Sequence, residues 1–264
     1  KVEFFKVTTT DNVEMDGWIL KPRNFDPGKK YPVLFYVYTE PWRTTVTDTY
    51  GVGVSSLYTG DMADDGYIYI SVDNRGTPAP KGRAWRKAIY RNIGQINIHD
   101  QAMAAREILK WSFVDPERIA VWGWSGGGST TLFAMTHSRE FRAGIAVAGV
   151  TWWRYYDTFY AERFLRRPEE NEEGYRATSV AEAAGSLHGR LLLVHGLSDD
   201  NVHAQNAFRF IDAAIAAGRT FDLMLYPGRD HGIGDPAARR HLYRLMLDFW
   251  DRNLGAAAVG EREF

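Results

Sequence analysis

The run Gly123-Trp124-Ser125-Gly126-Gly127 has the G-x-S-x-G spacing that presents a serine hydroxyl as a nucleophile. A serine hydroxyl reacts slowly unless a sharp turn exposes it and a neighbouring base removes its proton. Gly123 and Gly127 have no Cβ and leave room for such a turn. An apolar, strand-like run precedes the motif and a helix-like run follows it, so that the N–H groups at the helix start would face the developing negative charge. The pattern predicts that Ser125 is a nucleophile; a plain glycine-rich turn is the alternative.

An acid and a histidine follow Ser125 in the order that α/β-hydrolases use. Asp199 comes just after one apolar strand-like run, and His231 comes just after the next. The carboxyl ends of parallel strands meet at one edge of a sheet, so the three side chains would converge there. We expect His231 to take the proton of Ser125 and Asp199 to hold the imidazole in the required tautomer. Asp200 is the rival for the acid, and we favour Asp199.

The remaining histidines do not form a second constellation. His195 ends an apolar strand and is predicted to be buried for structural reasons. We interpret the others as structural or solvated, because they lie in helices or connections; these are His99, His137, His188, His203 and His241. No His and carboxylate pair at helical ligand spacing has a third partner, so we predict neither a metal site nor a cofactor.

Strand and helix signals alternate along the chain, which favours a mostly parallel sheet with helices on both faces. Residues 1–254 form one predicted domain and residues 255–264 a C-terminal tail. The predicted strands are residues 2–9, 13–20, 31–38, 67–72, 119–122, 143–150, 191–194 and 221–226. The predicted helices are residues 100–111, 130–135, 202–217 and 237–253, the first with Asp100 as its N-cap.

The composition is ordinary for a globular protein and narrows the function by exclusion. The 264 residues are 45% hydrophobic and 25% charged, and the formal net charge is −1, which argues against nucleic acid or an anionic membrane surface as a partner. The chain has no cysteine, so disulfides and thiolate chemistry are excluded, while a cytoplasmic and a periplasmic or secreted location both stay open. No apolar run approaches the ~18 residues that a membrane span needs, and no signal peptide is visible. Because the chain starts at Lys1, we interpret it as part of a longer protein.

Four strings together are specific enough to name a family. They are WGWSGG at 122–127, AGVTWWRYYDTFYAERF at 148–164, HGLSDDNVH at 195–203 and DHGI at 230–233. These strings resemble the prolyl oligopeptidase family, and within it the dipeptidyl peptidase IV-like branch. The resemblance covers nearly the whole chain and implies an α/β-hydrolase fold with an eight-stranded, mostly parallel sheet. It also implies a homodimer, for which the residues show no interface signature of their own.

The resemblance implies roles for further residues. Tyr38 matches the tyrosine whose hydroxyl helps to form the oxyanion hole, and the backbone N–H of Gly126 would be the second donor. Asn201 matches a polar group that contacts the substrate backbone. The apolar lining of a pocket for proline or another small side chain is matched by Val150, Trp153, Tyr156, Tyr160 and Val202. Ordinary core packing is the alternative for these aromatic residues.

The chain departs from the family pattern in three respects. Gly126 stands where close relatives often carry a tyrosine, so one side-chain wall of the pocket is lost. Thr39 and Glu40 follow Tyr38 where relatives usually have smaller residues. The family places a β-propeller upstream, and its acidic residues hold the free amine of the substrate in dipeptidyl peptidases; this chain carries no such segment.

The sequence therefore predicts a serine peptidase domain that acts on peptide substrates through an acyl-enzyme. Dipeptidyl-peptidase-like release after a penultimate proline or small residue is the first interpretation. An acyl-peptide hydrolase or an esterase of the same fold is the alternative within catalysis. A non-catalytic scaffold kept for dimerisation is the alternative from another class.

Overall fold

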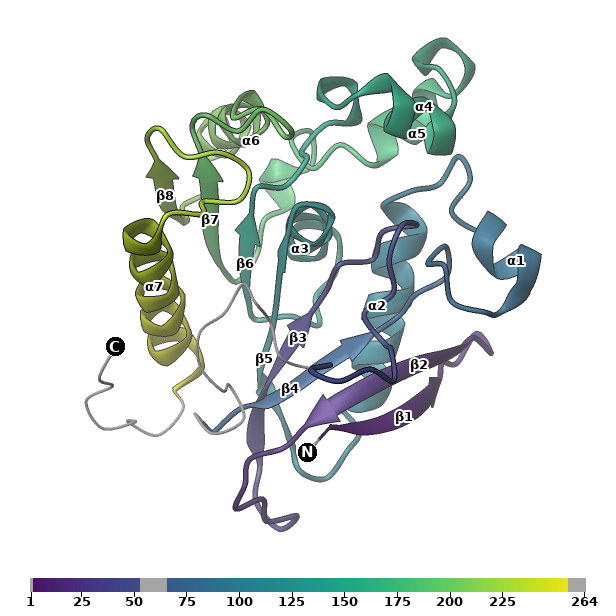
Figure 1. Ribbon diagram of the computed structural model, residues 1–264, viewed down its shortest axis with the longest axis vertical. Coiled ribbons are helices and arrows are strands. Elements are labelled where there is room, and N and C mark those ends of the chain that lie inside the picture. The colour runs from purple at the N-terminus through teal and green to yellow at the C-terminus, as the bar shows by residue number, and fades with distance from the viewer. Residues whose placement is uncertain (1, 53–65, 256–264) are drawn as a thin grey trace.

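A single eight-stranded sheet runs through the protein (Figure 1). The computed structural model describes residues 2–52 and 66–255. The strands are β1 (Glu3–Thr8), β2 (Glu14–Leu20), β3 (Tyr31–Tyr36), β4 (Ile68–Val72), β5 (Val114–Trp124), β6 (Ala143–Val147), β7 (Arg190–Gly196) and β8 (Asp222–Tyr226). Their order is β1-β2-β4-β3-β5-β6-β7-β8, and β1 and β2 are antiparallel to their neighbours while β4, β3 and β5 to β8 run parallel. The carboxyl ends of the parallel strands therefore share one edge.

The strand sequences alternate between two hydrophobic cores because successive side chains of a strand point to opposite faces. In β3, Val33 and Phe35 enter one core and Leu34 enters the other. In β7, Leu191 and Leu193 pack on the first face, whereas Leu192 packs on the second. Continuous apolar runs of this kind are typical of strands that are buried on both faces.

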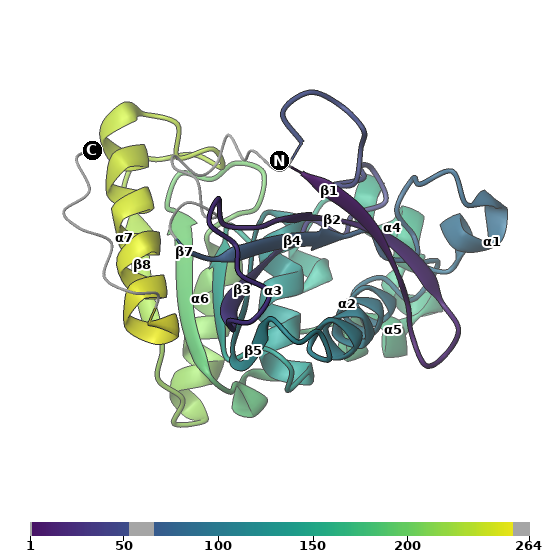
Figure 2. The ribbon, with the colours of Figure 1, turned by 90° about the horizontal axis from the view of Figure 1, so that it is seen from below.

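Helices cover both faces of the sheet (Figure 2). The first core takes residues from α2 (Gln95–Ile108), α3 (Gly126–His137) and α6 (Gln205–Ala216), and the second takes its helical residues from α7 (Pro236–Leu254). The mostly parallel eight-stranded α/β-hydrolase architecture predicted from the sequence is confirmed. Short helices lie outside these layers, and in Figure 1 α4 and α5 sit beyond the carboxyl ends of β6 and β7. The short helices are α1 (Gly82–Lys87), η1 (Trp153–Tyr155), α4 (Thr158–Leu165), η2 (Pro168–Glu170), α5 (Glu172–Ala177) and η3 (Ala184–Ser186).

The predicted start of α2 is wrong. The helix begins at Gln95, after Gly94 with its φ of 90°, and not at Asp100. The side chain of Asn97 accepts the N–H of Gly94 at 3.4 Å, which gives the helix a different N-terminal cap. Asp100 lies inside the helix and is 1% exposed; its carboxylate binds Arg75 through the Nη2 atom at 2.7 Å and the Nε atom at 3.0 Å. Asp100 is a residue type that often caps helices, but here it forms an ion pair with Arg75 in the loop that follows β4.

Other boundaries differ by a few residues. Helix α6 starts at Gln205 rather than at residue 202, because the N–H of Val202 donates to the carboxylate of Asp199 at 2.8 Å. Strand β6 ends at Val147, since Ala148 takes a φ of 49° that no strand can continue. The predicted tail falls mostly on residues 256–264, which lie outside the described residues. In the described chain, no helix combines the length and the apolar character needed to cross a bilayer.

Candidate active site

Ser125 occupies a strained turn between β5 and α3. Its φ of 59° and ψ of −119° lie where non-glycine residues are rare, and its N–H donates to the carbonyl of Val147 at 2.9 Å. A Cβ on Gly123 would lie 2.5 Å from the carbonyl oxygens of Gly127 and Val37, and one on Gly127 would overlap the Val37 carbonyl. The two motif glycines are therefore required by close backbone approach, and they hold the serine at the carboxyl edge of the sheet.

Asp199 and His231 form a direct hydrogen bond at the same edge. The Nδ1–H of His231 donates to the Oδ2 atom of Asp199 at 2.8 Å, which leaves the Nε2 atom free to act as a base. The other carboxylate oxygen accepts the N–H groups of Asn201 at 3.0 Å and Val202 at 2.8 Å. Burial would raise the pKa of Asp199, but hydrogen bonds from His195 and His231 outweigh it and hold that pKa well below its usual range. Asp199 is 5% exposed, whereas its rival Asp200 is exposed.

Two contacts tie the loop of His231 to the strand that carries Ser125. The indole Nε1–H of Trp124 donates to the carbonyl of His231 at 2.9 Å. Arg239 of α7 donates from Nη2 to the carbonyl of Gly232 at 2.6 Å and from Nε to that of Ile233 at 2.9 Å, and its guanidinium lies 5.0 Å from the centre of the Trp124 ring. Ser125 and His231 are more than a hundred residues apart in sequence. These contacts of Trp124, the residue before Ser125, hold the two segments side by side.

The other histidines lie away from this pair, with one exception. His195 is fully buried, and its Nε2–H donates to the carbonyl of Val202 at 2.7 Å, so it supports the turn that carries Asp199. His99, His137, His188 and His241 bond to Asp11, Thr136, the Phe141 carbonyl and Tyr226 respectively. Within residues 2–52 and 66–255, no three His, Asp or Glu side chains gather as a metal site would require.

Tyr38 follows β3 and lies next to the serine turn, because its Cα would be 3.4 Å from a Cβ on Gly127. Burial, followed by the charge of Glu40, raises the pKa of Tyr38, so that its phenol keeps its proton at neutral pH. Gly126 is the first residue of α3, and a helix leaves its first N–H groups without partners inside the helix. The backbone of Tyr38 and the N–H of Gly126 therefore lie at the serine turn, and both expected oxyanion donors carry a proton to donate.

The residues expected to line the pocket gather in one aromatic cluster. Val150, Trp153, Tyr160 and Val202 are buried in it, and Tyr156 packs against it half-buried. The rings of Trp153 and Tyr160 stack with centroids 5.4 Å apart, and Tyr156 meets Tyr160 edge-on at the same distance. Segments after β6 and β7 supply all of them. The hydroxyl of Tyr156 donates to the Oδ1 atom of Asn201 at 3.0 Å, which joins the expected substrate-backbone contact to the cluster.

Sequence reasoning missed two residues that the structure brings to the site. Arg239 carried no signal, since an arginine in an amphipathic helix is ordinarily solvated. Glu40 was noted only as a departure from a family pattern, yet it is 5% exposed and packs against Gly126. Its position two residues after Tyr38 was the one available sign.

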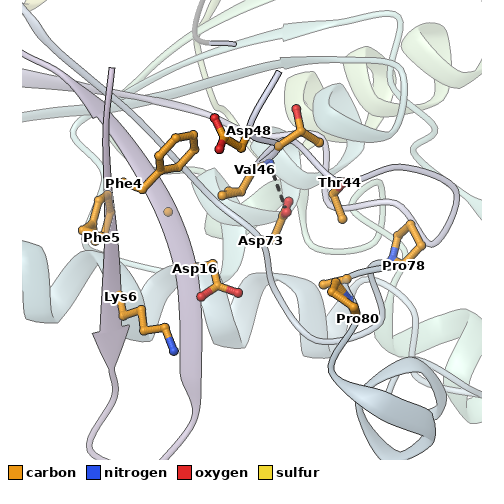
Figure 3. Close-up of a pocket in the computed structure, with 13 residues that line it drawn as sticks. Phe4, Phe5, Lys6, Asp16, Thr44, Val46, Asp48, Asp73, Pro78 and Pro80 are labelled. Atoms are coloured by element: carbon orange, nitrogen blue, oxygen red, sulfur yellow. Dashed lines mark hydrogen bonds between the residues drawn. The ribbon is translucent and has the colours of Figure 1, made fainter. Parts of the chain in front are cut away.

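A separate cavity of about 890 Å³ lies between β1 and the segments 44–48 and 78–80 (Figure 3). Its lining includes Asp16, Asp48 and Asp73 beside Phe4 and Phe5. Asp73 already accepts the N–H of Val46 at 3.1 Å, and none of the candidate site residues lines this cavity. No histidine or serine is among the residues that line this cavity.

Comparison with known proteins gives the family and the relatives of this chain. The model of the prolyl oligopeptidase family matches residues 55–257. A Neurospora crassa protein named a probable dipeptidyl-aminopeptidase B is 39% identical over 252 residues, which are 94% of this chain and 27% of that protein. An Emericella nidulans protein of the same name is 40% identical over 248 residues and is likewise covered over 27% of its length. The structure of Porphyromonas gingivalis dipeptidyl peptidase 4 superposes with a TM-score of 0.89 and 41% identity, over 96% of this chain and 35% of that one. The chain thus spans about a quarter of the length of the curated relatives it matches.

Proposed function

The chain belongs to the prolyl oligopeptidase family, and from that premise we propose that it is the catalytic part of a dipeptidyl-peptidase-like serine peptidase. Its substrates would be peptides with proline or another small residue at the second position. The observation that carries the proposal is the joint placement of the strained Ser125 turn, the bonded Asp199 and His231 pair and the aromatic cluster at one sheet edge. The names of the relatives, dipeptidyl-aminopeptidase and dipeptidyl peptidase, support the release of dipeptides.

The proposed reaction is acyl transfer through a covalent intermediate. The Oγ atom of Ser125 attacks the carbonyl of the scissile bond as His231 takes its proton, and Asp199 stabilises the imidazolium that results. The Tyr38 hydroxyl and the Gly126 N–H hold the oxyanion, donors that are typically worth about 3–4 kcal/mol each. His231 then protonates the leaving amine, and water releases the acyl group by the reverse path.

The test is hydrolysis of a chromogenic amide with proline on the acyl side of the scissile bond, by the protein and by Ser125→Ala. We expect cleavage that depends on Ser125. A covalent serine probe should label the protein and not the variant. Labelling without cleavage of the amide, but with cleavage of a small ester, would replace the peptidase proposal by an esterase; no labelling at all would refute serine catalysis.

A further inference from the structure

The carboxyl group of Glu40 is a buried polar group without a partner at the edge of the candidate site. Glu40 is 5% exposed; among the described residues its side chain makes no hydrogen bond or ion pair, and its carboxyl oxygens are not among the fully enclosed polar atoms, so they keep slight contact with solvent. Burial raises the pKa of its carboxyl to about 8, so the group is neutral at physiological pH. Buried polar atoms are nearly always hydrogen-bonded, because a polar group removed from water without a partner destabilises the protein. Such a group points to a ligand that supplies the missing partner.

The carboxyl lies beside the residue that follows the nucleophile. A Cβ on Gly126 would overlap the Oε1, Cδ and Cγ atoms of Glu40, so this side chain fills the space into which a side chain at position 126 would extend. When it is ionised, Glu40 raises the pKa of the phenols of Tyr38 and Tyr156, which belong to the expected oxyanion hole and pocket wall. Glu40 thus adjoins both the turn of the nucleophile and the aromatic cluster.

A small cavity adjoins the carboxyl. Its volume is about 10 Å³, close to the minimum for one water-sized group, and Val150 and Trp153 of the aromatic cluster line it together with Glu40. The polar side chains in its wall already have partners elsewhere. Ser129 accepts the N–H of Val150 at 2.8 Å, and the hydroxyl of Thr130 and the amide of Asn97 both bond to Thr39. No neighbour in the wall is left to serve the carboxyl.

We propose that Glu40 is a specificity-determining residue that selects a hydroxyl group on the acyl-side residue of the substrate, the residue whose carbonyl Ser125 attacks. Serine, threonine and hydroxyproline carry such a group. A protonated carboxyl both donates and accepts a hydrogen bond, as a hydroxyl does, so the two form a reciprocal pair. An ammonium or guanidinium would instead require the buried acid to ionise, and the cavity has no room for the long chain that carries it. The inference rests on the proposed function, because it assigns a preference to the same site.

The experiment compares matched substrates that differ by one hydroxyl. The value of kcat/KM is measured for chromogenic dipeptide amides with hydroxyproline against proline, and with serine against alanine, on the acyl side. The protein should favour the hydroxylated member of each pair by about tenfold. Glu40→Gln should keep part of this preference, because an amide also donates and accepts, and Glu40→Met should abolish it. Glu117→Gln, which removes a carboxylate at the exposed start of β5, is the matched control and should leave the ratio unchanged.

Two results would overturn the inference. One is a protein that cleaves these amides with no preference for the hydroxyl, or with a preference that Glu40→Met retains. The other is a preference for lysine or arginine that Glu40→Gln removes, which would make the group a cation receptor. Failure of the proposed function looks different, because no substrate would then be cleaved in a Ser125-dependent way. The affinities of Ser125→Ala for the same dipeptide amides, measured by calorimetry, compare the substrates with and without the hydroxyl in the absence of turnover. The preference is therefore measured whether or not the protein cleaves the amides.

Discussion

At the scale of single residues, the sequence leaves two candidates for the acid, Asp199 and Asp200, and the hydrogen bonds distinguish them. Both follow β7, and the strand end alone cannot separate them. Asp199 accepts two backbone N–H groups and the Nδ1–H of His231, while Asp200 faces solvent.

We expect Asp199→Asn to fold and to lower kcat by about 10⁴-fold, because the imidazole loses the anion that orients it. Asp200→Asn should change kcat less than about threefold. Steady-state kinetics with a thermal melt check both, and the reverse ranking would assign the acid to Asp200.

The buried carboxyl of Glu40 predicts a pH dependence of stability. Its pKa is about 8 in the folded protein against an ordinary value of 4.5 in the unfolded chain, so the folded chain holds a proton that the unfolded chain releases between these values. The contribution of this group is full below about pH 4.5 and is lost as the pH rises through about 8. The Glu40→Gln variant lacks this titration. Its free energy of unfolding, minus that of the unchanged protein, should therefore rise by up to about a few kcal/mol between pH 5 and pH 9.

Urea unfolding at the two pH values measures this difference, with Glu117→Gln as the reference variant. The neighbouring phenols of Tyr38 and Tyr156 have pKa values raised above the usual value of a tyrosine, so they stay protonated up to pH 9 and the comparison reports the carboxyl of Glu40. A stability difference that stays constant from pH 5 to pH 9 would contradict the burial of an unpartnered acid.

At the scale of elements, the parallel strands were predictable and the helix starts were not. Strands such as β3 and β7 can be recognised in the sequence, because a strand that is buried on both faces is a continuous apolar run. The start of α2 was misplaced because Asp100 is a good capping residue type, and nothing local reveals that its carboxylate binds Arg75 instead. The order of the serine, the acid and the histidine followed from strand ends, whereas the contacts of Arg239 depend on how α7 packs across the sheet.

Arg239 gives the prediction at this scale. It joins α7 to the His231 loop through the carbonyls of Gly232 and Ile233 and covers the ring of Trp124. We expect Arg239→Ala to lower kcat by about 10- to 100-fold, with a smaller change in KM, because the base is displaced while the pocket is untouched. Arg239→Lys should recover little, since an ammonium cannot reach both carbonyls in the planar geometry of a guanidinium. Equal kcat values for the protein and Arg239→Ala would show that the loop holds itself in place.

For the molecule as a whole, local patterns predicted the layers, while the pocket came from resemblance. Alternation of apolar strands and amphipathic helices leads to two cores about one sheet, and the structure has them. No periodicity distinguishes the aromatic residues of a pocket from those of a core, so Trp153 and Tyr160 could be placed only by similar strings in relatives. Glu40 could not be placed from sequence at all, because its neighbour Gly126 is 86 positions away and meets it only after β3 and β5 pair.

That contact also constrains how the protein can change over time. Glu40 and Gly126 share one space, so a larger residue at position 126 is admissible only in a lineage that has already shortened the side chain at position 40. The order of the two substitutions is therefore fixed, and each is neutral or harmful according to the state of the other. Among homologues, we expect the two positions to covary, with an acid at one accompanied by glycine at the other.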